Sequence, residues 1–70
     1  MRYAIVIEKG EGNYSAYVPD LPGCIATGNT LEEVKHNMRE ALVLHIEGMR
    51  EDGKPVPEPT AEVDHVEVAA

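Results

Sequence analysis

Two stretches near the start of the chain place apolar side chains at every second position, which is the period of a β-strand. The first covers residues 2–9 (RYAIVIEK) and the second covers residues 14–18 (YSAYV). Between them, the two glycines of residues 10–13 (GEGN) suit a hairpin turn. The pattern therefore predicts two antiparallel strands. The side chains expected to share a face are Tyr3, Ile5 and Ile7 in the first strand, and Tyr14, Ala16 and Val18 in the second.

A proline-rich connection follows the second strand. Pro19 and Pro22 lack the backbone N–H group that a sheet ladder needs, so residues 19–23 (PDLPG) leave the sheet and turn. Residues 24–28 (CIATG) then return as a third strand. In the connection, Asp20 is a turn-forming residue whose carboxylate hydrogen-bonds the backbone that follows it.

The apolar spacing changes to a helical period after Gly28. Thr30 and Glu33 form the pattern of a capping box, so the helix is expected to begin at Leu31. Gly53 and the prolines that follow it stop the helix, which is predicted over residues 31–52. The residues of the core-facing stripe are Leu31, Val34, Met38, Ala41, Leu42, His45, Ile46 and Met49.

The remaining residues predict a stiff link and a last strand. Residues 54–60 (KPVPEPT) favour an extended link, and the valine-rich residues 61–70 favour a fourth strand, although their alternation is imperfect. Residues 1–70 are then a single α+β domain of order β-β-β-α-β, a mixed sheet with one long helix packed on one face. The opposite face is left open. A chain of 70 residues buries a thin core, which favours self-association.

Charge narrows the classes of partner. Six Lys and Arg residues stand against thirteen Asp and Glu residues, for a formal charge of -7. Such a chain offers no basic patch to a phosphate backbone, so direct nucleic-acid binding is not expected and a basic protein is the better partner. The sequence shows neither a secretory signal nor an apolar run long enough to span a bilayer, so we expect a cytoplasmic protein.

The candidate chemical groups favour no catalytic, metal or cofactor site. Cys24, the single cysteine, lacks a neighbouring histidine that would activate its thiol, and is interpreted as a small buried side chain. His36 and His45 lie on opposite sides of the predicted helix, so they cannot share a metal ion. His45 is interpreted as a packed residue of the core stripe and His65 as a strand residue.

One helix face carries a more specific pattern, which we call the acidic ridge. Its residues are Glu33, Glu40, Glu47 and Glu51, with Leu44 alongside. At about 100° per residue they fall together on the side opposite the core stripe. Two interpretations remain: a solvated outer face, or a docking surface that speeds encounter with a basic partner. Val43 and Leu44 add apolar surface that suits contact with a second chain.

The order of these motifs resembles that of the HicB-like antitoxins over almost the whole chain. The matching stretches are YVPDLPGCIATGNTLEE and NMREALVLHIEGMREDGKPVPEP, followed by a final strand. The resemblance implies a partial RNase-H-like fold without nuclease activity. It also implies a partner, the toxin HicA, a small basic mRNA-cleaving ribonuclease. Many family members continue into a DNA-binding domain, which residues 1–70 do not contain.

Three hypotheses of function follow. The first is a binding module that sequesters a basic HicA-like toxin, with Asp20 at the border of the contact as an alternative to its scaffold role. The second is a metal-dependent nuclease, for which Glu8, Glu33 and Asp64 form the conceivable carboxylate set. The third is a scaffold that only self-associates, as a dimer or a larger homo-oligomer.

Overall fold

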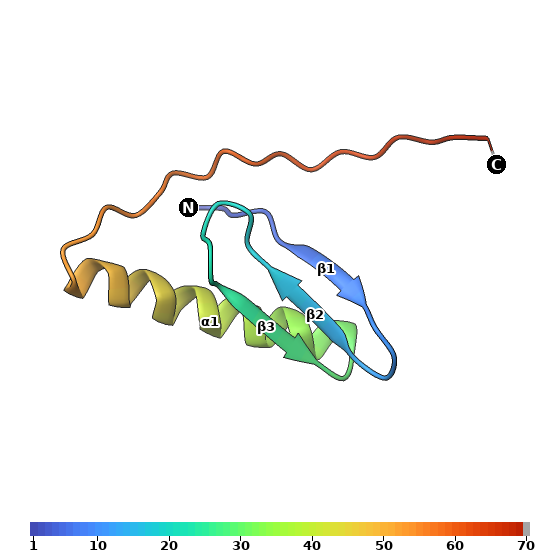
Figure 1. Ribbon diagram of the computed structural model, residues 1–70, viewed down its shortest axis with the longest axis horizontal. Helices are drawn as coiled ribbons and strands as arrows, with labels where there is room; N and C mark the ends of the chain where they lie inside the picture. The colour runs from blue at the N-terminus through green and yellow to red at the C-terminus, as the bar shows by residue number, and fades with distance from the viewer. Residues whose placement is uncertain (70) are drawn as a thin grey trace.

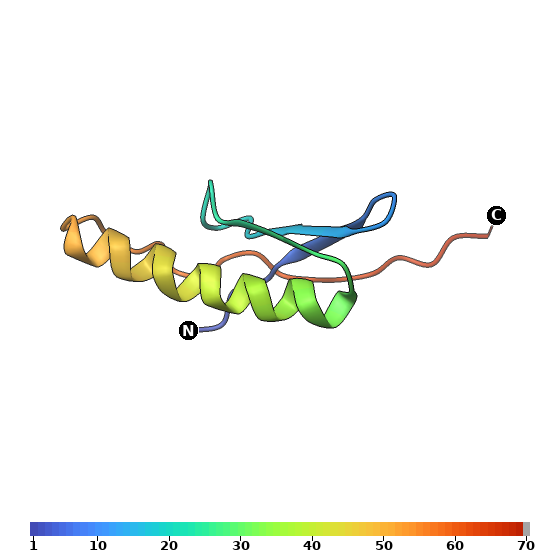
Figure 2. The ribbon, with the colours of Figure 1, turned by 90° about the horizontal axis from the view of Figure 1, so that it is seen from below.

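The computed structural model describes residues 1–69 and consists of a small sheet packed on one long helix (Figure 1). The elements are β1 (Val6–Lys9), β2 (Tyr14–Tyr17), β3 (Ile25–Gly28) and α1 (Leu31–Glu51). Both strand pairs are antiparallel, and the sheet order is β1-β2-β3. Seen from the side, α1 lies below the sheet (Figure 2). The predicted α+β class, with a long helix on one face of the sheet, is confirmed.

The strand register separates an inner row of side chains from an outer one. Ala16 pairs with Ile7 on one side and Ala26 on the other, and this row faces α1, since Ala16 is 3% exposed. One position further along, Tyr17 pairs with Ile25, which is 69% exposed. The sheet is therefore open on the face away from the helix, as the alternating pattern predicted.

The proline-rich connection between β2 and β3 is a packed turn. The N–H of Leu21 donates to the carbonyl of Val18 at 3.1 Å, and the N–H of Cys24 donates to the carbonyl of Leu21 at 3.1 Å. Gly23 has a φ of 87°, a conformation that favours glycine. These bonds turn the Leu21 side chain into the core, where it is 1% exposed. Residues 19–23 thus contribute to the scaffold directly.

Nearby groups supply hydrogen-bond partners at both ends of α1. The hydroxyl of Thr30 accepts from the N–H of Glu33 at 3.0 Å, and the Glu33 carboxylate accepts from the N–H of Asn29 at 3.2 Å. At the other end Gly53 has a φ of 70°, and the N–H of Lys54 donates to the carbonyl of Met49 at 2.9 Å. The predicted start of the helix is confirmed, and the helix ends one residue before the predicted end.

The core lies between α1 and strands β2 and β3. Its buried members are Ala16, Val18, Leu21, Cys24, Val34 and Met38. Gly28 brings β3 very close to the helix, because a Cβ atom at this position would lie 2.5 Å from the backbone nitrogen of Val34. Only a residue without a side chain permits this approach.

The predicted fourth strand is not formed within residues 61–69. The chain after α1 is extended but pairs with no strand, so the sheet is antiparallel and not mixed (Figure 1). Two contacts attach this segment to the rest of the fold. The hydroxyl of Tyr3 donates a hydrogen bond to the carbonyl of Pro57, and the carboxylate of Asp20 accepts hydrogen bonds from the N–H groups of Thr60 and Ala61. Beyond these anchors, residues 62–69 are exposed and form no ladder with the sheet of their own chain.

Candidate partner-binding surface

The residues of the acidic ridge are all exposed and all belong to the 21-residue helix α1. Its four glutamates are exposed along α1. Leu44 is 68% exposed and Val43 is 50% exposed among these charges. The surface therefore combines a carboxylate row with an apolar centre. All residues predicted for the ridge share this exposure: Glu33, Glu40, Leu44, Glu47 and Glu51.

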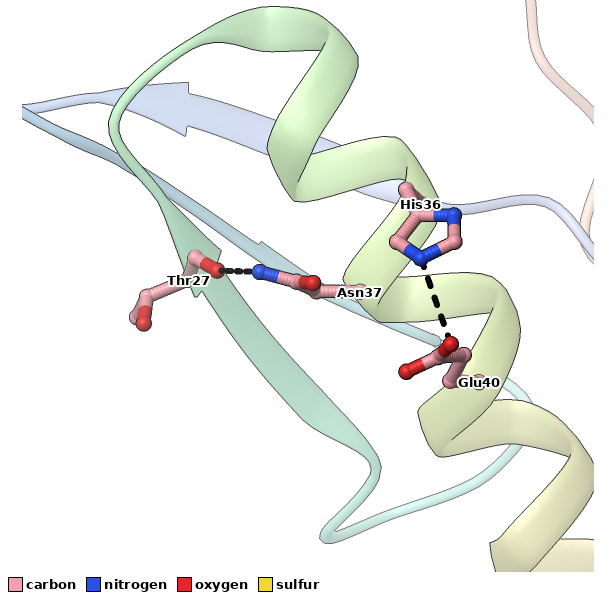
Figure 3. Close-up of polar contacts among 4 residues, drawn as sticks. All are labelled: Thr27, His36, Asn37 and Glu40. Carbon is pink, nitrogen blue, oxygen red and sulfur yellow. Dashed lines mark hydrogen bonds and ion pairs between the residues drawn. The ribbon is translucent and has the colours of Figure 1, made fainter.

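The ridge glutamates differ in what they contact. Glu33 accepts the helix-capping bond from Asn29. Glu40 lies 3.2 Å from the Nε2 atom of His36, an exposed contact that is an ion pair only when the imidazole is protonated (Figure 3). Glu47 and Glu51 take part in no side-chain hydrogen bond or ion pair with residues 1–69. The carboxylates readiest to meet a cationic partner are therefore those in the second half of α1.

Asn37 fixes how the helix lies on the sheet. Its Nδ2 atom donates to the backbone carbonyl of Thr27 at 2.8 Å, from the helix to the outer edge of β3 (Figure 3). This bond covers part of that edge and connects α1 to β3. The opposite edge of the sheet, along β1, has no such cover from a helix side chain.

Asp20 is engaged within the chain. Its carboxylate accepts from the hydroxyl of Thr60 at 2.7 Å, from the N–H of Thr60 at 3.1 Å and from the N–H of Ala61 at 3.0 Å. The hydroxyl of Thr60, followed by the N–H of Ala61, lowers the pKa of Asp20 below its ordinary value. The hydrogen bonds that Thr60 and Ala61 donate to the Asp20 carboxylate, which we call the Asp20 anchor, are therefore fully formed at neutral pH. They weaken only as the pH falls through this lowered pKa. The residues near Asp20 in the sequence do not indicate this contact, because its partners lie about 40 positions away.

Cys24 lies in the core and is 2% exposed. Burial raises the pKa of its thiol, because an apolar surrounding disfavours the thiolate. The side chain is thus a small apolar residue of the core, as its sequence context predicted.

A chemical test of this burial uses an aromatic disulfide reagent at neutral pH. We expect Cys24 to react at least about tenfold more slowly than an exposed thiol, because the reagent needs both access and a thiolate. The variant Ile25→Cys supplies that exposed thiol in the same molecule, and denaturation should make the two reactivities equal. Equal rates in the folded protein would contradict the buried position.

The conceivable nuclease set is not assembled. Across residues 1–69, no group of three or more His, Cys, Asp and Glu side chains is placed to hold a metal ion, so Glu8, Glu33 and Asp64 do not meet. None of the helices described is both long and apolar enough to cross a membrane.

Sequence reasoning missed several exposed apolar groups. Tyr17 and Ile25 lie together on the open face of the sheet, and the alternation of the strands already contained this signal. It also missed the cations Lys35, Arg39 and Arg50, which line a groove beside the N-terminal segment. Their helical spacing places these cations next to the ridge, and Arg39 also lines a shallow hollow with Glu40 and Leu44.

Comparison with known proteins places this arrangement in a family. A model described as the HicB-like antitoxin of bacterial toxin-antitoxin systems matches residues 3–69. The chain belongs to the HicB-like antitoxin family. Its fold is also similar to a chain of a solved structure described as a HicA3 and HicB3 toxin-antitoxin complex, with a TM-score of 0.75 and 37% identity. That match covers 86% of this chain and 70% of the other.

Relatives in sequence agree with this membership. A 14.9 kDa protein from the rep-hol intergenic region of Haemophilus phage HP1 is 49% identical over 57 residues, covering 81% of this chain and 43% of the relative. Antitoxin HicB 2 of Photorhabdus laumondii is 32% identical over 71 aligned positions, covering 100% of this chain and 51% of the relative. The chain therefore spans about half the length of these two relatives, or less.

Proposed function

We propose that this protein is a binding module that sequesters a small basic HicA-type toxin and breaks no bond itself. The observation that carries the proposal is the similarity of its fold to a chain of a HicA3 and HicB3 toxin-antitoxin complex. The partial RNase-H-like fold implied by the family is part of the proposal. So are a cytoplasmic location, where a toxin would meet mRNA, and the absence of direct nucleic-acid binding by a chain of charge -7.

The acidic ridge supplies the physical basis for recognition. Exposed carboxylates attract a basic protein and raise its rate of association, while apolar contacts at the centre of an interface slow dissociation. Glu51 and Glu40 would guide the toxin, and Leu44 with Val43 would be desolvated beneath it. The Asp20 carboxylate is occupied by the C-terminal link, so its proposed part in this contact is to hold neighbouring backbone in place.

The absence of a catalytic step is supported by the state of the candidate groups. The Cys24 thiol is buried with a raised pKa, so it is protonated at neutral pH and shielded from substrates. Two-metal hydrolysis needs carboxylates that converge on one point, and those of Glu8 and Glu33 belong to separate elements that form no such group within the described chain.

Charge reversal on the ridge tests the proposal. With a purified HicA-type toxin, the double variant Glu40→Lys, Glu51→Lys should associate about tenfold more slowly than the unchanged protein at low salt, and the difference should shrink as salt is added. Stopped-flow or surface-based kinetics measures both rates. Glu47 is left unchanged because it also lines the groove between α1 and the N-terminal segment.

The matched control is Glu8→Lys, Glu11→Lys, which makes the same change in net charge on exposed residues at the hairpin. Its effect on association should be clearly smaller. Equal slowing by both pairs would mean that net charge alone acts, and the ridge would lose its role. No binding of any HicA-type toxin would leave the self-associating scaffold as the function.

A further inference from the structure

The sheet ends in a free edge along β1. This strand pairs with β2 on one side, and no strand of residues 1–69 pairs with its other side. The edge of β3, in contrast, is partly covered by the bond from Asn37 to Thr27. A free strand edge presents unpaired N–H and C=O groups that can accept a further strand.

A groove lies next to the start of this strand, between α1 and residues 1–5, which lead into β1. Its volume is about 570 Å³. Apolar residues line it: Met1, Tyr3, Ile5, Met38, Leu42, Val43 and Ile46. Three cations from α1 line it as well, Lys35, Arg39 and Arg50, with Glu47 as the acidic exception. A segment that suits this groove would place apolar side chains against the apolar lining residues and carboxylates near the cations.

Residues 62–69 of the chain have this chemistry. They are extended and exposed, and their valines are among the most exposed large apolar side chains of the protein, with Val63 at 68%, Val66 at 87% and Val68 at 75%. Acidic residues stand between and beside the valines: Glu62, Asp64 and Glu67. The segment contains no proline and is rich in valine, which favours a strand once a partner edge is present.

The segment does not occupy the groove of its own chain. Asp20 holds Thr60 and Ala61 beside the connection between β2 and β3, and the chain continues from this anchor past the sheet (Figure 1). The side view likewise shows the C-terminal end extending beyond the sheet (Figure 2). None of the groove-lining residues comes from residues 62–69. The anchor thus presents a strand-forming segment outward.

We propose that residues 62–69 of each copy pair with the β1 edge of a second copy and fill its groove. Each copy then donates one strand and accepts one, so the exchange closes as a symmetric dimer. The second strand addition becomes intramolecular once the first has formed, which strengthens two individually weak contacts. This exchange gives a surface to the self-association expected of so small a core, and it does not depend on the toxin.

The first test is the oligomeric state of the full chain, measured by sedimentation equilibrium over a range of concentrations. The unchanged protein should be a dimer. Val66→Pro removes a backbone donor from the middle of the proposed strand and should raise the dimer dissociation constant about tenfold or more. Residue 66 is exposed in the single chain, so the helical circular dichroism of the variant should be unchanged.

Glu58→Pro is the matched control. It places the same residue in the exposed, proline-rich link, outside the proposed strand, and should leave the dimer intact. A monomeric unchanged protein would overturn both the self-association and its proposed surface. A dimer that survives Val66→Pro would overturn only the strand exchange and favour another face, such as the one that carries the exposed Leu44.

The second test shows which copy holds the strand. In a mixture of isotope-labelled and unlabelled chains, filtered nuclear Overhauser spectra should connect the methyl groups of Val66 or Val68 in one copy with those of Leu42 or Ile46 in the other. Contacts confined to one chain would overturn the exchange in favour of an intramolecular strand. Contacts that arise only after a HicA-type toxin is added would overturn it in favour of the toxin as occupant.

Discussion

Replacing Gly28 with alanine should destabilise the fold by about 3 kcal/mol or more. The added Cβ would lie 2.5 Å from the nitrogen and 2.9 Å from the Cα of Val34, which are backbone atoms of the helix and cannot swing aside. The helix must therefore move away from β3, and Val34 and Met38 would lose part of their packing. Urea denaturation followed by circular dichroism measures the change in the free energy of unfolding.

Gly48→Ala provides the opposite expectation within the same protein. Gly48 lies inside α1, and a Cβ there would meet no atom within 4 Å. Alanine should therefore stabilise the protein by roughly 0.5–1 kcal/mol through helix propensity. If Gly28→Ala were as well tolerated as Gly48→Ala, the close approach of β3 to the helix would be wrong.

Replacing Leu21 with alanine should cost about 2–5 kcal/mol of stability, because the side chain is 1% exposed and its removal leaves a cavity in a thin core. A domain of this size has a total stability of roughly 4–10 kcal/mol, so a substantial unfolded fraction is expected. Thermal and urea denaturation of the variant measure the loss.

The exposed residue Ile25 gives the control for Leu21. Ile25→Ala removes an apolar side chain that is 69% exposed, so the stability should change by less than about 0.5 kcal/mol. Leu21→Ala and Ile25→Ala together separate the two roles considered for the proline-rich connection. If Leu21→Ala kept full stability while toxin binding was lost, the connection would be a contact surface and not a part of the scaffold.

One helix carries two surfaces of opposite charge. The acidic ridge is exposed along α1, and the cations Lys35, Arg39 and Arg50 line the groove between α1 and the N-terminal segment. Glu47 and Val43 belong to both, since each is part of the proposed toxin surface and also lines the groove. A toxin on the ridge and a strand of a second copy in the groove would therefore be neighbours. Measuring toxin binding and dimerisation separately, with variants that avoid Glu47 and Val43, distinguishes the two.

Local signals in the sequence predicted most of the fold. The turn at GEGN, the prolines of the connection, and the cap formed by Thr30 and Glu33 act over a few residues, so their structural consequences can be recognised without the rest of the chain. The acidic ridge was predictable for the same reason, because positions on one helix are related by a constant rotation. Its exposure agrees with that prediction, while its binding role remains a proposal.

The fourth strand and the role of Asp20 were not predictable in this way. A strand forms only when an edge accepts it, and valine content alone does not say whether residues 61–69 reach an edge of their own sheet. Asp20 bonds Thr60 and Ala61, about forty positions away along the chain. No pattern within a short window contains that information.

The sequence by itself determined the order of the elements, the helix and its caps, the excess of acidic charge and the row of glutamates, because each depends on the identity and spacing of near neighbours. Only the tertiary structure decided which carboxylates already accept hydrogen bonds within the chain, which sheet edge is free, and that residues 61–69 do not join the sheet. These properties depend on contacts between residues that are far apart in the sequence. Such contacts compete with one another, so which of them form depends on the whole fold.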